Sequence, residues 1–445
     1  MSLQKQYPRV LLVASGKINS SDTSNNGLLL RNLFGKDWPR VHIAQIYSTG
    51  DNGDPGFFGQ YYKLGPSDRR LGKLFFRLKS ESSSLYDKPH QAQSASAGLM
   101  YRLKSRIRSL ANRYIIDSGV YELVFRPKIS GEMHSWIREF NPDVILAQGY
   151  TLSFTLLPLF IKQFTNARLA VFPTDDWPKY QYAGMHGEPS LFRPIMKAVI
   201  TKSAARLFAH ADIPLAFGDP MTAEYTRRYN KVFLNVNHAD DPMRFENCTA
   251  VRVNEPATFT IAAIGTFNEF RWPLLLDANE ACRALKTDGL NVRLSVFTSF
   301  MPEQARTELA NASFIDIYPD PGNDHLPSYL KGADALLLLE GFDQGFVSAI
   351  KLSISSKAHL FMFSQRPIIV YAAAETGIAQ YALDYGWATV VSHRSITELA
   401  KALKNTLCDS GLANELVLKA NMVAHERHTH QVNQSIFRNA LLRRS

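Results

Sequence analysis

The stretch ADALLLLEGF, residues 333–342, contains an unbroken apolar run from Ala335 to Leu339. Such a run is typical of a strand that is buried on both faces of a parallel sheet. The polar stretch from Asp343 to Ser353 follows it, and we expect it to be a loop. The run IIVY at 368–371 predicts the next strand.

A helix is expected between these two strands. The segment from Lys357 to Phe363 is apolar enough to be a buried helix, and Ser355 and Ser356 before it are residue types that cap helices. A helix N-terminus beyond the end of a parallel strand attracts anions, and Lys357 adds a full positive charge. We interpret this segment as a diphosphate site; the alternative is a capped helix with a solvated lysine.

The length of 445 residues favours two domains, because one core rarely supports so long a chain. A strand at Val10–Ala14, a polar loop, Gly27 and an apolar helix at 28–34 begin the first alternation of strands and helices. The alternation restarts with FTIAAIG at 259–265, and a loop that carries Arg271 follows. This order predicts an α/β fold with two doubly wound domains.

We interpret the polar segment at 246–257 as the hinge between the domains. We therefore expect a first domain over about 1–250 and a second over 257–420. The helical tract after it, from about 421 to 445, is expected to return to the first domain.

We interpret the formal net charge of +10 as concentrated in one segment of the chain. Residues 69–113 hold eleven Lys and Arg against two acids, and a basic helical insert is expected over about 66–116. Its first part has leucines at helical spacing with cations on the other side, which is typical of a helix at a membrane surface. A solvated helical pair and a nucleic-acid surface are the alternatives, although no nucleic-acid reader motif accompanies the charge. The expected membrane contacts are Arg70, Lys73, Phe75 and Arg77.

Two consecutive acids, Asp175 and Asp176, lie at the C-terminal tip of the expected strand LAVFPTDDWP at 169–178. A buried carboxylate is costly unless it is paired, so we expect no core role for them and interpret both as site residues. The alternative is a turn in which one of them caps a helix before Pro178.

The order of an apolar strand, Ser-x-Lys, a short helix and x-Arg-Pro resembles the donor half of the GT-B glycosyltransferases, especially bacterial enzymes near family 4. The resemblance implies two Rossmann-like domains that face a cleft, and Asp175 or Asp176 on the acceptor side. It also implies a donor site in which the helix N-terminus and its lysine hold the diphosphate. The residues that it assigns to the donor are Gly27, Gly265, Thr266, Arg271, Tyr318, Ser355, Ser356 and Lys357.

Two features depart from that family's pattern. The run Thr174-Asp175-Asp176 has Asp where family 4 enzymes often have His. A pair of glutamates eight positions apart is replaced by Leu352 and Leu360.

The resemblance implies a retaining, metal-independent transfer of a sugar from a nucleotide diphosphate-sugar to a hydroxyl of a glycan or lipid-linked acceptor, in surface polysaccharide synthesis. No cofactor and no nucleic-acid partner are expected. A nucleotide-sugar epimerase and a non-catalytic binding relative remain as alternatives. Three widely spaced cysteines, no apolar run of membrane-spanning length and no signal-like N-terminus favour a cytoplasmic protein. From the basic insert we add the expectation of peripheral contact with the inner face of the cell membrane.

Overall fold

The computed structural model describes residues 7–20, 24–50, 56–72, 119–180 and 192–443. The chain divides into two compact units. The first comprises Met1–Ala216, Tyr225–Leu234 and Arg438–Ser445, and the second comprises Phe217–Glu224 and Asn235–Phe437.

The division falls earlier than the expected hinge at 246–257. This segment packs within the second unit, because the Val251 amide donates a hydrogen bond to the Ser328 carbonyl oxygen and the Lys331 ammonium group donates to the Cys248 carbonyl oxygen. The end of the chain returns to the first unit at Arg438, which is later than the expected residue 421.

The first unit is built on a seven-stranded sheet in the order β3-β2-β1-β4-β5-β6-β7. The pairs from β3 through to β6 are parallel, and β1 and β4 are buried along their whole length. Tyr61 and Tyr62 lie in the edge strand β3. The strands are β1 Val10–Val13, β2 Ile43–Tyr47, β3 Gln60–Lys63, β4 Val144–Ala147, β5 Arg168–Val171, β6 Ile213–Phe217 and β7 Leu234–Val236.

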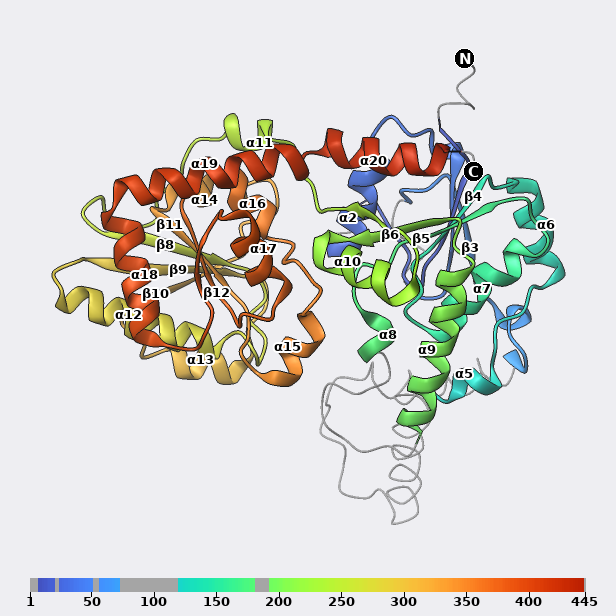
Figure 1. Cartoon of the computed structure of the whole chain (residues 1–445), viewed down its shortest axis with the longest axis horizontal. Coiled ribbons are helices and arrows are strands. Elements are labelled where there is room, and N and C mark those ends of the chain that lie inside the picture. The colour runs from blue at the N-terminus through green and yellow to red at the C-terminus, as the bar shows by residue number, and fades with distance from the viewer. Residues whose placement is uncertain (1–6, 21–23, 51–55, 73–118, 181–191, 444–445) are drawn as a thin grey trace, which may run out of the picture. The chain divides into compact units, whose positions relative to one another are not determined.

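Helices lie on both faces of this sheet (Figure 1). Three of them begin at a Ser or Thr whose side chain accepts a hydrogen bond from a backbone amide of the first turn, namely Ser24, Ser130 and Thr151. The helices are α2 Asn25–Phe34, α5 Tyr121–Val124, α6 Gly131–Phe140, α7 Leu152–Lys162, α8 Trp177–Tyr180 and α9 Arg193–Ala209. Helix α10, Gly218–Tyr229, begins in the part of the chain assigned to the second unit and ends in the first.

The second unit is built on a six-stranded parallel sheet in the order β10-β9-β8-β11-β12-β13. The predicted strand Ala335–Leu339 is confirmed as β11, and all five of its residues are buried. The other strands are β8 Phe259–Ile264, β9 Val292–Thr298, β10 Ile315–Pro319, β12 Ile368–Tyr371 and β13 Thr389–Val391.

Helices also cover both faces of the second sheet (Figure 1). They are α11 Met243–Glu246, α12 Pro273–Thr287, α13 Glu303–Leu309, α14 Leu326–Gly332, α15 Gln344–Ile350, α16 Ala358–Phe363, α17 Gly377–Tyr385, α18 Ile396–Cys408 and α19 Ser410–Arg427. The chain ends with α20, His430–Leu442.

Two local predictions near β11 are wrong. The segment from Asp343 to Ser353 is not a loop throughout, because the Asp343 side chain caps α15 and Phe346 of that helix is buried. Ser355 and Ser356 do not cap α16: the cap position is occupied by Lys357, and no side chain caps this helix.

Three histidine rings stack inside the second unit. The ring centroids of His238 and His359 are 5.7 Å apart, and those of His359 and His428 are 6.1 Å apart. The Nδ1 atom of His428 lies 2.8 Å from the His238 carbonyl oxygen, so it carries the proton, and Nε2 accepts from the Tyr381 hydroxyl at 2.8 Å. Burial lowers the pKa of His428 to about 4 and that of His359 well below its ordinary value. These rings are therefore neutral in the folded unit.

We expect the second unit to lose stability as the pH falls from about 6.5 toward 4. The unfolded chain protonates His428 near pH 6.5 and the folded unit does not, so acid favours unfolding. This group alone should lower the free energy of unfolding by about 2 kcal/mol at pH 5 relative to pH 7.5. Urea unfolding at pH 7.5 and pH 5 measures the difference. His428→Gln should reduce it, and substitution of the exposed His393 by Gln should not. An unchanged pH dependence in His428→Gln would contradict the assignment.

Candidate functional site

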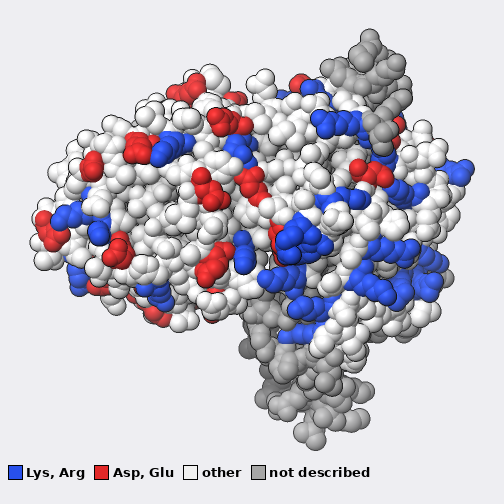
Figure 2. Space-filling view, in the orientation of Figure 1, with Lys and Arg blue, Asp and Glu red and all other residues white. Residues whose placement is uncertain are grey.

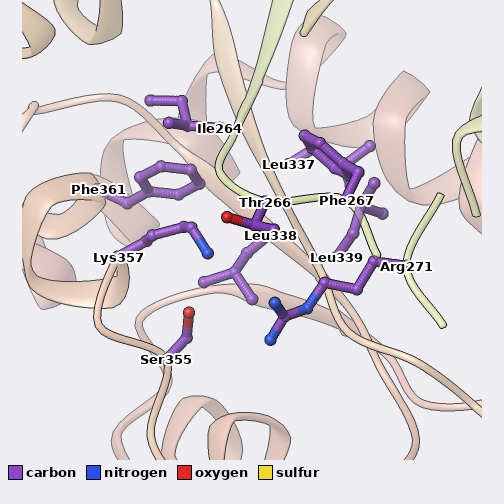
Figure 3. Close-up of a pocket in the computed structure, with 10 residues that line it drawn as sticks. All are labelled: Ile264, Thr266, Phe267, Arg271, Leu337, Leu338, Leu339, Ser355, Lys357 and Phe361. Carbon is purple, nitrogen blue, oxygen red and sulfur yellow. The ribbon is translucent and has the colours of Figure 1, made fainter. Parts of the chain in front are cut away.

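A small hollow lies at the carboxyl ends of β8 and β11. Ile264 ends β8, and Leu337, Leu338 and Leu339 of β11 form its apolar wall. About 270 Å³ of free space, open solvent included, lies among its lining residues. The polar side chains that line it are Thr266, Arg271, Ser355 and Lys357 (Figure 3).

The position of the hollow follows from the sheet topology. The connections from β8 lead to β9 on one side and, later in the chain, to β11 on the other, so the strand order reverses between β8 and β11. Ligands of open α/β sheets bind beyond the carboxyl ends of the strands at such a reversal. The fold therefore places the hollow where a ligand is expected.

Lys357 directs its ammonium group into the hollow (Figure 3). In the described part of the chain no carboxylate lies within ion-pair distance of this group. Desolvation and the neighbouring Arg271 lower the pKa of Lys357 to about 8, although Glu340 and Asp320 oppose the shift. The lysine is thus a charged group that its surroundings do not neutralise.

Arg271 reaches the same hollow but has a partner. Its Nη2 atom lies 2.7 Å from Glu340 Oε2, and its Nε atom donates to the same oxygen at 2.8 Å. Glu340 is buried and directly follows β11. The charges of Arg271 and Glu340 cancel. The Lys357 ammonium group therefore gives the site a net charge of +1, which suits it to bind an anion.

Gly265 gives Lys357 its space. A Cβ atom at residue 265 would lie 2.0 Å from Lys357 Cε and 2.5 Å from Nζ, and the φ angle of Gly265 is +130°. Both the close approach and the backbone angle require glycine here. The exposed Thr266 follows and lines the hollow.

The backbone contributes less than the sequence suggested. Helix α16 has only six residues, and the Ala358 amide at its start donates to the Ser355 carbonyl oxygen. The Ser355 hydroxyl faces the hollow, whereas Ser356 is not among its lining residues. The positive charge of the site therefore comes mainly from side chains.

Tyr318 lies away from the hollow. It is in β10, the edge strand of the second sheet, and its ring stacks on Phe297 with centroids 5.2 Å apart. The structure thus brings together Gly265, Thr266, Arg271, Ser355 and Lys357, and not Tyr318.

Gly27 lies in the first turn of α2, which begins two residues before it. Its amide donates to the Ser24 hydroxyl at 3.1 Å, so this N–H already has an acceptor. The neighbouring Asn26 exchanges two side-chain hydrogen bonds with Gln148, at 3.0 and 2.6 Å, at the end of β4. Gly27 thus serves the helix cap, and a donor contact through its amide would compete with that bond.

Asp176 has a role in the core of the first unit. Its carboxylate is buried, accepts two hydrogen bonds from Arg228 at 2.6 and 3.0 Å, and accepts another from the Tyr225 hydroxyl at 3.0 Å. The expectation that neither acid has a core role is wrong for Asp176, because three donors compensate its burial.

Asp175 belongs to a different polar cluster. Its Oδ2 atom accepts from the Tyr150 hydroxyl at 2.9 Å, and the Thr174 hydroxyl lies 2.5 Å from the same tyrosine oxygen. Since the tyrosine proton goes to Asp175, Thr174 donates to Tyr150. Burial raises the pKa of Asp175, while the bond from Tyr150 opposes the shift.

The backbone that carries Tyr150 is held in an unusual conformation. Gly149 and Tyr150 have φ angles of +86° and +75°, and this region is costly for tyrosine. A Cβ atom at Gly149 would lie 2.3 Å from the buried Trp177 ring. The fold thus maintains a strained turn at the end of β4 that directs the Tyr150 hydroxyl to Asp175.

Three of the four expected membrane contacts, Lys73, Phe75 and Arg77, lie outside the described residues. The fourth, Arg70, is exposed. None of the helices in the described ranges has the length and apolar content that crossing a bilayer requires. Nor do the described residues contain a group of three or more His, Cys, Asp or Glu side chains that could hold a metal ion together.

Sequence reasoning missed two residues that shape these clusters. Glu340 could have been found as the first polar residue after a buried strand, β11, with Arg271 in the loop that follows the neighbouring strand β8. The role of Tyr150 depends on its backbone angle, for which the only sequence signal is the preceding glycine.

No protein-family model matches the sequence, and no curated protein matches it in a sequence search. Solved structures do match. Sucrose-phosphate synthase from Thermosynechococcus elongatus superposes with a TM-score of 0.59 at 14% identity, with 96% of each chain covered.

Two further solved structures superpose over nearly their whole length. WaaG, a glycosyltransferase involved in lipopolysaccharide biosynthesis, gives a TM-score of 0.55 at 12% identity over 96% of this chain and 98% of WaaG. Anabaena HepE in complex with UDP and glucose gives 0.54 at 11% identity over 97% and 98% of the two chains. At these identities the similarity establishes the architecture: two α/β units with parallel sheets of seven and six strands, which is the GT-B fold.

Proposed function

We propose that this protein is a glycosyltransferase that moves a sugar from a nucleoside diphosphate-sugar to a hydroxyl group of a glycan or lipid-linked acceptor. The observation that carries the proposal is the unneutralised Lys357 ammonium group in the hollow beside Gly265. A diphosphate is the anionic part of such a donor, and it is the group that leaves during transfer. The fold supports the proposal, because WaaG is a glycosyltransferase and HepE was solved with UDP.

The chemistry of the site suits departure of the diphosphate. Negative charge grows on the bridging oxygen as the sugar–phosphate bond breaks, and fixed positive groups lower the barrier when they are already oriented toward that charge. Lys357 supplies a point charge, and Arg271, held by Glu340, presents a planar donor group. These two side chains perform the task that a metal ion performs in other transferases, so we propose a metal-independent reaction.

Asp175 is the residue that we propose for the acceptor. Its Oδ2 atom accepts a hydrogen bond from Tyr150, and burial raises its pKa above the ordinary value of a carboxyl group. It could accept the proton of the attacking hydroxyl or orient that hydroxyl by a hydrogen bond. The family 4 resemblance favours a retaining reaction and thus orientation, with an acceptor of surface polysaccharide synthesis.

A thermal-shift screen against UDP, GDP, ADP and dTDP tests the proposal first. We expect one nucleoside diphosphate to raise the melting temperature, with UDP tried first because HepE was solved with it. If none of the four raises it at millimolar concentration, the diphosphate site is absent and the proposal fails.

We expect Lys357→Met to weaken binding of that nucleoside diphosphate by roughly 10- to 100-fold, because a hydrogen bond to a charged group contributes about 1.5–3 kcal/mol. Isothermal titration calorimetry measures the affinity. The matched control is Lys351→Met, since Lys351 is exposed and does not line the hollow. Arg271→Gln is made together with Glu340→Gln, so that no buried charge is left unpaired. Equal affinity in the wild type and Lys357→Met would contradict the site.

We expect Asp175→Asn and Asp176→Asn to fail in different ways. Asp175→Asn should fold, bind the nucleotide and lose transfer, by about 10²- to 10⁴-fold if the carboxylate is the base. Asp176→Asn should lose roughly 3–5 kcal/mol of stability, because Arg228 is left without its counterion. Nucleotide release with a panel of acceptors measures transfer, and urea unfolding measures stability. Wild-type transfer by Asp175→Asn would place the acceptor site elsewhere.

A further inference from the structure

The two units differ strongly in charge. The described residues of the first unit include 23 Lys and Arg and only 9 Asp and Glu, whereas those of the second include 16 and 24. The interpretation that the basic charge is local to residues 69–113 is therefore wrong: the whole first unit is basic and the second is acidic. Figure 2 shows many blue and few red side chains on the visible face of the first unit. Such a unit attracts an anionic partner.

Helix α9 concentrates this charge on an open face. One side of it is buried in the first unit through Met196, Ile200, Leu207 and Phe208. The other side exposes Lys197, Lys202 and Arg206, and the helix contains no acidic residue. No ion pair to these three cations occurs within the described ranges. They are available to an external anion.

Short side chains occupy the middle of the exposed side of α9. At 100° per residue, Thr201 and Ala205 lie along this middle, with Lys197 at one border and Lys202 and Arg206 toward the other. The long stems of lysine and arginine let such flanking cations reach past alanine and threonine toward a shared partner. Cations spread in this way suit an extended anionic partner better than a single small anion.

Apolar side chains stand at the beginning of the same helix. Ile195 is 52% exposed, and Phe192, which precedes the helix, is 38% exposed. Exposed aliphatic and aromatic groups beside unpaired cations are suited to the boundary between lipid headgroups and acyl chains. A nucleic-acid partner would give these apolar groups no comparable environment.

We propose that the outer face of α9 is a docking surface for an anionic lipid membrane. The face comprises Lys197, Lys202 and Arg206 together with Ile195 and Phe192. It consists of residues other than the four expected membrane contacts, and it shares none with the diphosphate hollow. The proposal therefore does not depend on the proposed reaction, although a lipid-linked acceptor would be reached from such a surface.

The test uses the full chain with the triple charge reversal Lys197→Glu/Lys202→Glu/Arg206→Glu. The matched control is Arg306→Glu/Lys351→Glu/Lys401→Glu, which changes the net charge equally at exposed residues of the second unit. Cosedimentation is measured with vesicles of phosphatidylcholine containing about a third phosphatidylglycerol, at low salt. Each basic residue near an anionic surface strengthens partitioning into the vesicles roughly fivefold. Without three such residues, the α9 variant should partition roughly 100-fold more weakly than the wild type.

We expect the control to partition like the wild type and pure phosphatidylcholine to bind neither protein strongly. Circular dichroism and melting temperature verify folding, and Lys197→Gln/Lys202→Gln/Arg206→Gln replaces the reversal if it fails to fold. Unchanged partitioning of the α9 variant overturns the proposal. Equal losses in both triple variants also overturn it, because the effect would then be net charge rather than this face. Loss of binding to a single-stranded RNA probe without loss of vesicle binding would identify a nucleic-acid surface instead. Nucleoside diphosphate affinity, measured alongside, reports separately on the proposed reaction.

Discussion

The ammonium group of Lys357 is the charge on which the proposed site depends. The site holds a second cation, Arg271, but the buried Glu340 neutralises it. Of these two cations, it is Lys357 that has no carboxylate within ion-pair distance among the described residues. A desolvated lysine with no counterion is unfavourable, and its pKa of about 8 reflects that cost. An anionic ligand would relieve it. The glycine at 265 is required for the same reason, because any side chain there would occupy the space of the lysine.

The strand order determines where this charge is displayed. In both sheets the strand order reverses next to the first strand of the sheet, while the strands stay parallel. The reversal lies between β1 and β4 in the first unit and between β8 and β11 in the second. In each unit the polar cluster lies beyond a strand at this reversal: Lys357 and Arg271 beyond β8 and β11, and Tyr150 with Asp175 beyond β4 and β5. The same topology, used twice, thus produces one site suited to an anion and one suited to a hydroxyl group.

Much of this arrangement could be predicted from the sequence. The run Ala335–Leu339 is a strand because a continuous apolar segment of that length is stable only when both of its faces are buried, and Lys357 and Arg271 were identified by their positions after strands. Burial partners could not be predicted in the same way. Asp176 looked like Asp175 in sequence, but Arg228, 52 residues later, gives it a structural role.

Other differences had local physical causes. The segment after Asp343 was expected to be a loop because it is polar, yet an aspartate cap and the burial of Phe346 are sufficient for a short helix. The charge of the molecule seemed local because the surplus of the first unit is hidden in the total by the acidic second unit. Only the division of the chain into units reveals it.

The pH dependence of nucleoside diphosphate affinity is the sharpest test of whether Lys357 holds the diphosphate. If Lys357 holds the diphosphate, affinity should be constant up to about pH 8 and then fall by nearly tenfold per pH unit, because the free lysine loses its proton and the bound one retains it. Lys357→Arg keeps a charge that does not titrate in this range, so its affinity should stay level to pH 9.5. A decline of equal slope in both proteins would show that another group holds the diphosphate. The assignment of Lys357 as the diphosphate-binding residue would then be wrong.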